Sequence, residues 1–166
     1  MRLRTSIFSG FTLVESMIAV AISGLFLSSV FVMNISSMDT IRGAKESVAA
    51  SQVLQQRIES LRIANWQQIT SATWLAANTL HADAAGTDVL KNLSETLTLV
   101  PYGSATVGNT TLTRKSGGTT IVSQNAALLS ENAIKVIWTA DFTGAPNNRA
   151  ISRQIVAILA KGGVAK

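Results

Sequence analysis

An uncharged apolar run near the N-terminus constrains the fold of this 166-residue chain more than any other feature. No charged residue occurs between Glu15 and Asp39, and the intervening positions are rich in Ile, Val, Leu, Phe and Ala, with no Pro. As a helix that rises ~1.5 Å per residue, this run extends roughly 34 Å, close to the ~30 Å hydrocarbon thickness of a bilayer. The run therefore predicts a membrane-spanning helix.

The charges on either side of the run predict its orientation. Arg2 and Arg4 precede it without an opposing acid, whereas positive and negative residues nearly cancel after it. Because basic residues stay on the cytoplasmic side, we expect a single-pass membrane protein whose N-terminus is cytoplasmic and whose remainder lies outside the cytoplasm. A secretory signal would be shorter, with its small-residue cleavage site after the apolar stretch. Here Ser9-Gly10 comes before the run, so cleavage after Gly10 would remove only the basic leader.

Glu15 stands where the membrane helix should begin. A charged residue at the centre of a membrane helix costs ~2.5–3.5 kcal/mol and less near the interface, so such carboxylates are usually paired or functional. Cleavage after Gly10 would create a new α-amine at Phe11, and that amine on a neighbouring copy could reach Glu15. A staggered stack of helices would then pair each carboxylate with the next amine. The alternative is a Glu at headgroup level with no role.

The segment Gly10-Phe11-Thr12-Leu13-Val14-Glu15, followed by the apolar run, strongly resembles the prepilin motif of type IV pilins and type II secretion pseudopilins. The resemblance is close over residues 1 to about 35. It implies that a prepilin peptidase cleaves after Gly10 and N-methylates Phe11, and that Glu15 guides subunit docking during filament assembly. It also implies other pilin or pseudopilin subunits, an inner-membrane assembly platform and an ATPase as partners.

Helical periodicity continues after the apolar run. Positions three and four residues apart form a mostly apolar stripe, which consists of Ile41, Ala44, Val48, Ser51, Leu54, Ile58 and Leu61. We predict one helix from about Phe11 to Arg62, with its outer half packed on a globular head. Two helices with a break near Asn34 to Ser37 are the alternative.

The C-terminal part predicts strands. A short helix and a loop are expected over 65–92, and strand patterns follow at 95–100, 105–114, 119–123, 134–139 and 151–159. Together they predict an antiparallel sheet of four or five strands with one face on the helix stripe. The expected fold class is therefore α+β and pilin-like, with the long N-terminal helix on a C-terminal antiparallel sheet.

The same patterns divide the chain into four segments. Residues 1–10 are the expected leader peptide and 11–34 the transmembrane or filament-core helix. Residues 35–64 form the outer half of the helix, and 65–166 form the globular α+β head.

The sequence offers no set of residues that indicates catalysis or metal binding. His81 is the single histidine and there is no Cys, so clustered metal ligands are missing and a Ser/His/acid triad is disfavoured. Asp83 and Asp88 bracket Gly86, but their spacing does not fit a calcium loop of the EF-hand type. We expect no enzyme activity, no cofactor and no metal, and we expect His81 on the surface.

The basic and aromatic residues of the head have simple interpretations. Arg114, Lys115, Arg149 and Arg153 are interpreted as solvated charges, so nucleic acid is not an expected partner. The three tryptophans are interpreted as core or interface anchors; they are Trp66, Trp74 and Trp138.

The function expected from these observations is structural. The chain is interpreted as a minor pilin or pseudopilin that polymerises through its N-terminal helix into a type IV pilus-like filament or a type II secretion pseudopilus. The lack of Cys, and with it of the C-terminal disulfide loop of many major pilins, favours a minor subunit or pseudopilin. The alternative is a single-pass, membrane-anchored periplasmic binding or adaptor protein that does not polymerise.

Overall fold

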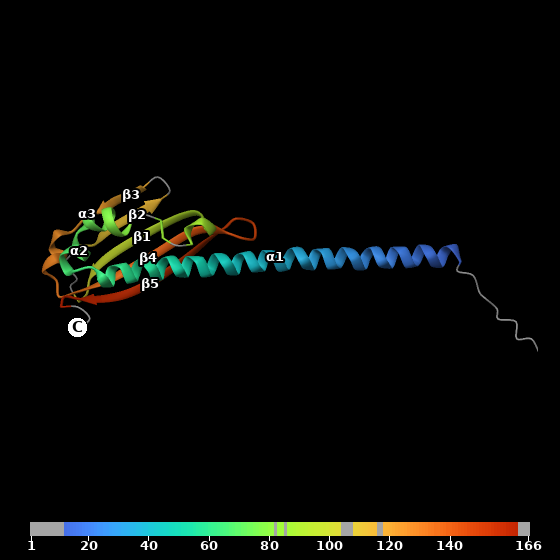
Figure 1. Ribbon diagram of the computed structural model, residues 1–166, viewed down its shortest axis with the longest axis horizontal. Helices are drawn as coiled ribbons and strands as arrows, with labels where there is room; N and C mark the ends of the chain where they lie inside the picture. Colours follow the sequence, from blue (N-terminus) through green and yellow to red (C-terminus); the bar gives the residue numbers. More distant parts are fainter. Residues whose placement is uncertain (1–11, 82, 85, 104–107, 116–117, 163–166) are drawn as a thin grey trace, which may run out of the picture. The chain divides into compact units, whose positions relative to one another are not determined.

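The computed structural model describes residues 12–162, apart from 82, 85, 104–107 and 116–117 (Figure 1). The chain separates into two units, residues 1–39 and residues 40–166. One long helix, a set of short helical segments and a five-stranded sheet make up the described residues.

Helix α1 runs from Leu13 to Ile63 without interruption, which confirms the prediction of a single helix. The predicted alternative of a break near Asn34 to Ser37 is wrong. The serine hydroxyl at Ser37 donates to the carbonyl of Met33, one turn earlier, at 2.9 Å. Because that hydroxyl has its hydrogen-bond partner within the helix, Ser37 does not interrupt the helix.

The sheet is fully antiparallel and has the strand order β3-β2-β1-β4-β5. This confirms the predicted α+β fold, and the sheet has five strands where four or five were predicted. The strands are β1 (Lys91–Pro101), β2 (Thr110–Lys115), β3 (Gly118–Ser123), β4 (Ala133–Gly144) and β5 (Arg149–Ala160).

Strand β2 begins at Thr110, later than the sequence pattern predicted. Gly108 and Asn109 precede it outside the sheet, and the earlier part of the predicted strand includes residues 104–107, outside the described residues. The carbonyl of Gly108 accepts a hydrogen bond from the side chain of Asn125 at 2.7 Å. A side-chain partner thus replaces the ladder hydrogen bond that a longer strand would have used.

Short helical segments connect α1 to the sheet. They are α2 (Trp66–Thr70), α3 (Ala72–Trp74), the π-helical turn η1 (Leu75–Thr79) and the 3-10 turn η2 (Thr87–Val89), and a further 3-10 turn, η3 (Ala126–Ser130), precedes β4. Asn65 caps α2 with a reciprocal capping box that includes Gln68. This cap explains why a new helix starts at Trp66, only three residues after α1 ends.

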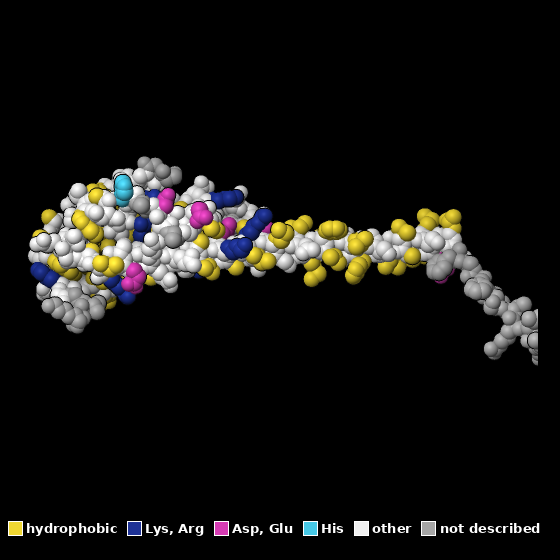
Figure 2. All heavy atoms as spheres, in the orientation of Figure 1, with side chains coloured by type: hydrophobic (Ala, Val, Ile, Leu, Met, Phe, Trp, Pro, Cys, Tyr) yellow, Lys and Arg dark blue, Asp and Glu magenta, His cyan; other side chains and the backbone are white. Residues whose placement is uncertain are grey.

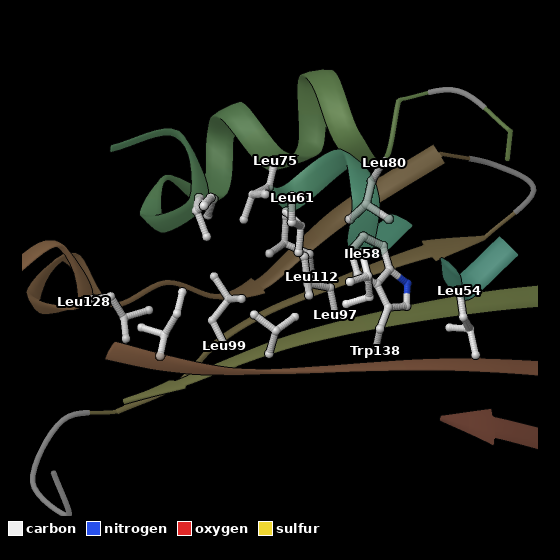
Figure 3. Close-up of a cluster of buried hydrophobic side chains, with 14 of the residues drawn as sticks. Leu54, Ile58, Leu61, Leu75, Leu80, Leu97, Leu99, Leu112, Leu128 and Trp138 are labelled. Atoms are coloured by element: carbon white, nitrogen blue, oxygen red, sulfur yellow. The ribbon is translucent and has the colours of Figure 1, made fainter. Parts of the chain in front are cut away.

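The main hydrophobic core lies between one face of the sheet and these helices (Figure 3). Trp138 of β4 is fully buried, and so are Leu97 and Leu99 of β1. Figure 3 shows Ile58 and Leu61 of α1 together with Leu75 and Leu80 among the side chains over these strands. The predicted role of Trp138 as a core anchor is confirmed, whereas Trp66 and Trp74 are only partly buried against the same core.

The buried stripe of α1 differs from the predicted stripe. Ile41 and Val48 are 55% and 57% exposed, so the first half of that prediction is wrong. The buried positions are Glu46, Ala49, Ala50, Val53, Leu54, Arg57, Ile58 and Leu61. The predicted stripe contained no charged residue, but the buried face includes Glu46 and Arg57, because the β4–β5 turn and β1 supply their hydrogen-bond partners.

Candidate functional site

The N-terminal part of α1 is an apolar helix whose side chains are all exposed. Every residue from Thr12 to Met38 is exposed in the single chain, and Figure 2 shows hydrophobic side chains along this part of the helix. In length and composition, α1 is a helix that could cross a membrane, and none of its most apolar window is buried within the chain. This surface needs a covering that the described residues of the chain do not provide.

The apolar surface is large enough to decide where the helix resides. Fifteen large apolar side chains between Leu13 and Met38 are exposed. At ~1.5–3 kcal/mol for each side chain, moving them out of water is worth roughly 20–45 kcal/mol. The ~2.5–3.5 kcal/mol cost of one charged residue inside a membrane is small by comparison. The position of Glu15 therefore does not prevent this segment from entering an apolar environment.

Glu15 lies in the first turn of α1, three residues after the residue that caps the helix. The hydroxyl oxygen of Thr12 accepts a hydrogen bond from the backbone N–H of Glu15 at 3.3 Å. Thr12 is therefore the N-cap and Glu15 the third helical residue, which is the Ser/Thr-x-x-Glu pattern of a capping box. A carboxylate at this position also interacts favourably with the positive end of the helix dipole.

The capping pattern is visible in the sequence, as Thr12 followed three residues later by Glu15 ahead of an apolar run, and it is a signal separate from those that predicted a role for Glu15. It gives Glu15 a role in the helix of its own chain besides the predicted role between subunits. The ion pairs found among the described residues do not include Glu15. The other two predicted site residues, Gly10 and Phe11, lie outside the described residues.

A buried ion pair joins α1 to the centre of the sheet. Arg57 donates to both carboxylate oxygens of Glu95 in β1, at 2.8 and 2.9 Å. The Glu95 side chain is completely buried and that of Arg57 is nearly so. Arg57 also donates to the backbone carbonyl of Thr79, at the end of η1. This bidentate arrangement fixes the position of α1 along the sheet through directional contacts that apolar packing alone lacks.

Arg114 of β2 extends this pair to the loop after η1. It donates to Glu95 at 3.1 Å and to the carboxylate of Asp83. The hydrogen bond and the charge of Arg114 lower the pKa of Asp83, and partial burial of Arg114 is outweighed by the two carboxylates, which raise the pKa of its guanidinium. The interpretation of Arg114 as a solvated charge is therefore wrong, because its neighbours are two acids.

A second polar contact holds α1 to the hairpin between β4 and β5. The buried carboxylate of Glu46 accepts a hydrogen bond from the backbone N–H of Ala145 at 2.8 Å. Gly144 permits this approach, since a Cβ at that position would lie 2.8 Å from the same carboxylate oxygen. Glu46 thus acts as a structural acceptor in the head.

The residues considered for metal binding are dispersed. His81 is exposed, as predicted, Asp83 pairs with Arg114, and Asp88 lies exposed in η2. Within the described ranges no three His, Asp or Glu side chains come close enough to hold a metal ion. The described acids that are buried, Glu46 and Glu95, have hydrogen-bond donors from the fold itself. These groups therefore serve the packing of the head.

The remaining basic candidates are exposed. Lys115, Arg149 and Arg153 lie on the surface of the strands, and Arg153 donates to the hydroxyl of Ser47 in α1 at 2.9 Å. They do not gather with Arg114, whose side chain faces the interior.

Trp66 donates through its indole N–H to the carbonyl of Leu129 at 3.0 Å, so this tryptophan joins α2 to η3.

Comparison with known proteins adds one match. Residues 6–31 match the prokaryotic N-terminal methylation motif. No curated protein and no solved structure shows significant similarity to the chain. The match covers the segment in which Gly10, Phe11 and Glu15 occur, together with most of the exposed apolar helix.

Proposed function

We propose that this chain, whose N-terminal methylation motif supports a type IV pilin- or pseudopilin-type precursor, is a structural subunit of a filament. The proposed filament is a type IV pilus-like fibre or a type II secretion pseudopilus, and the proposed role is that of a minor pilin or pseudopilin. The single observation that carries this proposal is the matched motif on an apolar helical segment, Thr12 to Met38, that is exposed at every residue.

The proposed maturation follows from the order of the N-terminal segments. A prepilin peptidase would remove residues 1–10 by cleavage after Gly10 and would N-methylate Phe11. Before assembly, residues 11–34 would anchor the subunit in the inner membrane, with the head in the periplasm. An assembly platform and its ATPase would then transfer the subunit into the filament, where 11–34 form the core and the remaining residues, 35–64 and 65–166, form the outer helix and the head.

Apolar packing would hold the proposed filament together. The same fifteen exposed side chains that favour the bilayer would be buried against copies of the helix. Apolar packing is not directional, so it does not by itself fix the stagger between neighbouring helices. We propose that the ion pair between Glu15 and the α-amine of Phe11 on the adjoining subunit sets that stagger, because an unpaired charge in an apolar environment is costly.

The two roles of Glu15 can be separated by choosing the substitution. Gln at the third helical position retains a capping side chain but has no charge, so Glu15→Gln preserves the helix start and removes the proposed ion pair. We expect Glu15→Gln to be inserted in the membrane and cleaved like the parent, yet to be incorporated into filaments at least tenfold less. Immunoblots of sheared filament and membrane fractions measure both quantities.

Thr12→Val is the matched control, because it removes the capping acceptor and retains the carboxylate. It should weaken the helix start by about 1 kcal/mol and leave incorporation close to that of the parent. If Glu15→Gln assembles as well as the parent, the proposed ion pair is wrong. If instead Thr12→Val fails to assemble while Glu15→Gln succeeds, Glu15 acts only within its own helix.

The mature N-terminus tests the filament proposal against its alternative. Intact mass measurement of the protein from membranes should give a chain that starts at a methylated Phe11. A membrane-anchored periplasmic adaptor would keep residues 1–10 and would not appear in a filament. Recovery of only the full-length precursor, in a host whose prepilin peptidase is active, would contradict the filament proposal.

A further inference from the structure

A groove lies at the end of the head where α1 and α2 meet the last strand. It has a volume of about 450 Å³ and is lined mainly by apolar side chains, among them Leu61, Trp66, Ile69, Ile158 and Leu159. One wall is therefore helical and the other is the C-terminal end of β5. The indole hydrogen bond from Trp66 to Leu129 fixes the helical wall.

Strand β5 forms an edge of the sheet along this groove. It pairs with β4 over its whole length, and no described strand pairs with its other side. Seven consecutive residues, 154–160, contain neither a charge nor a proline, the two devices that most often block an edge strand. The backbone N–H and C=O groups on that side are thus available to another extended segment.

A helix beside an open strand edge is suited to bind an extended peptide. Such a peptide adds to the sheet through backbone hydrogen bonds, and its alternate side chains enter the adjoining groove. At ~3.3 Å per residue, the uncharged part of β5 offers roughly 23 Å of edge. The opposite edge, β3, has only six residues and does not line this groove.

The charges around the edge indicate the chemistry of the partner. Arg149 and Arg153 lie in the first half of β5, while Arg62 and Lys161 lie at the end beside the groove. No acid occurs in β5 or in segment 64–69, although Arg62 pairs with Glu59 on the surface. Residues 40–166 contain twelve Lys and Arg against seven Asp and Glu, a formal net charge of +5. A second copy of this head would be repelled, whereas an acidic segment would be attracted.

We propose that the free edge of β5 and its groove bind an extended peptide segment of another protein, with alternating apolar side chains and acidic residues at its ends. The segment adds to the sheet as a sixth strand next to β5. This site is separate from the exposed apolar segment of α1, Thr12 to Met38, and goes beyond the proposed role in a filament.

The proposal is tested with the full chain in detergent micelles and a labelled ten-residue peptide of alternating Val and Thr, flanked by Asp and Glu. Fluorescence anisotropy should show saturable binding. A peptide with Lys flanks should bind at least tenfold more weakly. Equal binding of the two peptides, or no binding of the acidic one, would overturn the proposal.

Matched substitutions locate the binding on the surface. Ile158→Glu places a charge beside the groove at a position that is 56% exposed, so the fold tolerates it. It should weaken binding of the acidic peptide at least tenfold. The control Val122→Glu makes the same kind of change on the other edge strand, at 64% exposure, and should bind like the parent. Loss of binding in the control but not in Ile158→Glu would contradict the proposal.

Hydrogen exchange gives a readout that does not depend on substitutions. Addition of a strand should slow amide exchange in β5 when the peptide is present, with little change in β3. Protection confined to other segments would overturn the proposal. Self-association of the chain that buries β5 in the absence of peptide would show that a second copy is the occupant, which also contradicts it.

Discussion

The two halves of α1 differ in what their side chains require. From Thr12 to Met38 the helix is apolar and exposed, and its single acid lies in the first turn. In the outer half, the buried face contains the charged residues Glu46 and Arg57, while Ile41 and Val48 are exposed. The same secondary structure thus presents apolar groups outward in one half and buries charged groups in the other.

The difference shows where each half obtains its stabilising contacts. The buried charges of the outer half have partners in the same chain, namely Glu95, the carbonyl of Thr79 and the N–H of Ala145. The apolar side chains of the first half can leave water only through a lipid bilayer or other helices. The outer half of α1 therefore finds its stabilising contacts within the monomer, whereas the first half does not.

The largest expected effect concerns the buried charge in the outer half. Arg57→Met removes the bidentate partner of the completely buried Glu95 carboxylate, which then has only the single hydrogen bond from Arg114, and breaking a buried pair costs up to about 3–5 kcal/mol. The control Arg62→Met removes an exposed pair with Glu59 and should change stability by less than ~1 kcal/mol. Urea unfolding of the full chain in micelles measures both. Equal stabilities for the two variants would show that the buried ion pair does not stabilise the head more than the exposed pair does.

A charge introduced into the first half should affect membrane insertion and leave the head intact. Leu27→Lys is expected to weaken insertion by ~2.5–3.5 kcal/mol, because it places a cation near the centre of the apolar run. Val48→Lys is the control in the outer half, since Val48 is exposed to a similar degree. The ratio of extractable to membrane-embedded protein measures the effect. Similar extraction of both variants would mean that the two halves do not differ in their need for lipid.

The close approach of α1 to the β4–β5 hairpin gives a smaller effect. Gly144→Ala should destabilise the head by about 1–3 kcal/mol, because its Cβ would clash with the Ile151 side chain and crowd the Glu46 carboxylate at 2.8 Å. Gly43→Ala is the control within α1: its nearest neighbour is the Ala145 carbonyl at 3.5 Å, and Ala favours the helix by about 0.5–1 kcal/mol. Thermal unfolding should thus shift in opposite directions for the two variants. A shared direction would argue against the close contact.

The smallest expected effect concerns pH. The pKa of Asp83 is lowered below its ordinary value of 3.8 by Arg114, so the folded state favours the carboxylate. The resulting stability is present above that ordinary value and is lost as the pH falls through the lower, folded-state pKa. Because Asp83 is largely exposed, its pair should contribute less than ~1 kcal/mol. Unfolding of the parent and Asp83→Asn should therefore differ at pH 7 and converge as the pH falls through the lowered pKa of Asp83.

Much of the candidate site could be predicted from the sequence because it depends on residues that lie close together along the chain. The apolar run, the leader and the Thr12 to Glu15 spacing follow from adjacent residues, and the matched motif covers the same segment. The continuity of α1 and the five strands were predicted for the same reason, since periodicity and turn residues act over short distances. The boundaries of β2 were less predictable, because a side-chain hydrogen bond from Asn125 determines where its ladder begins.

The buried face of the outer half of α1 could not be predicted from the rule that charged side chains stay in water. Glu46, Ala50, Val53, Arg57 and Leu61 follow helical spacing as well as the predicted stripe does. Only the sheet shows which stripe is buried, because Glu95 and Ala145, far along the chain, supply the partners that make burial of the two charges favourable.

The amino-acid sequence alone specifies that the N-terminal segment is an apolar helix that begins in a methylation motif, since composition and spacing suffice to make such a surface avoid water. The tertiary structure decided which face of α1 packs on the sheet and which strand edge remains open. Those outcomes depend on pairings between residues distant in sequence, such as Arg57 with Glu95 and β4 with β5, and local patterns do not encode them.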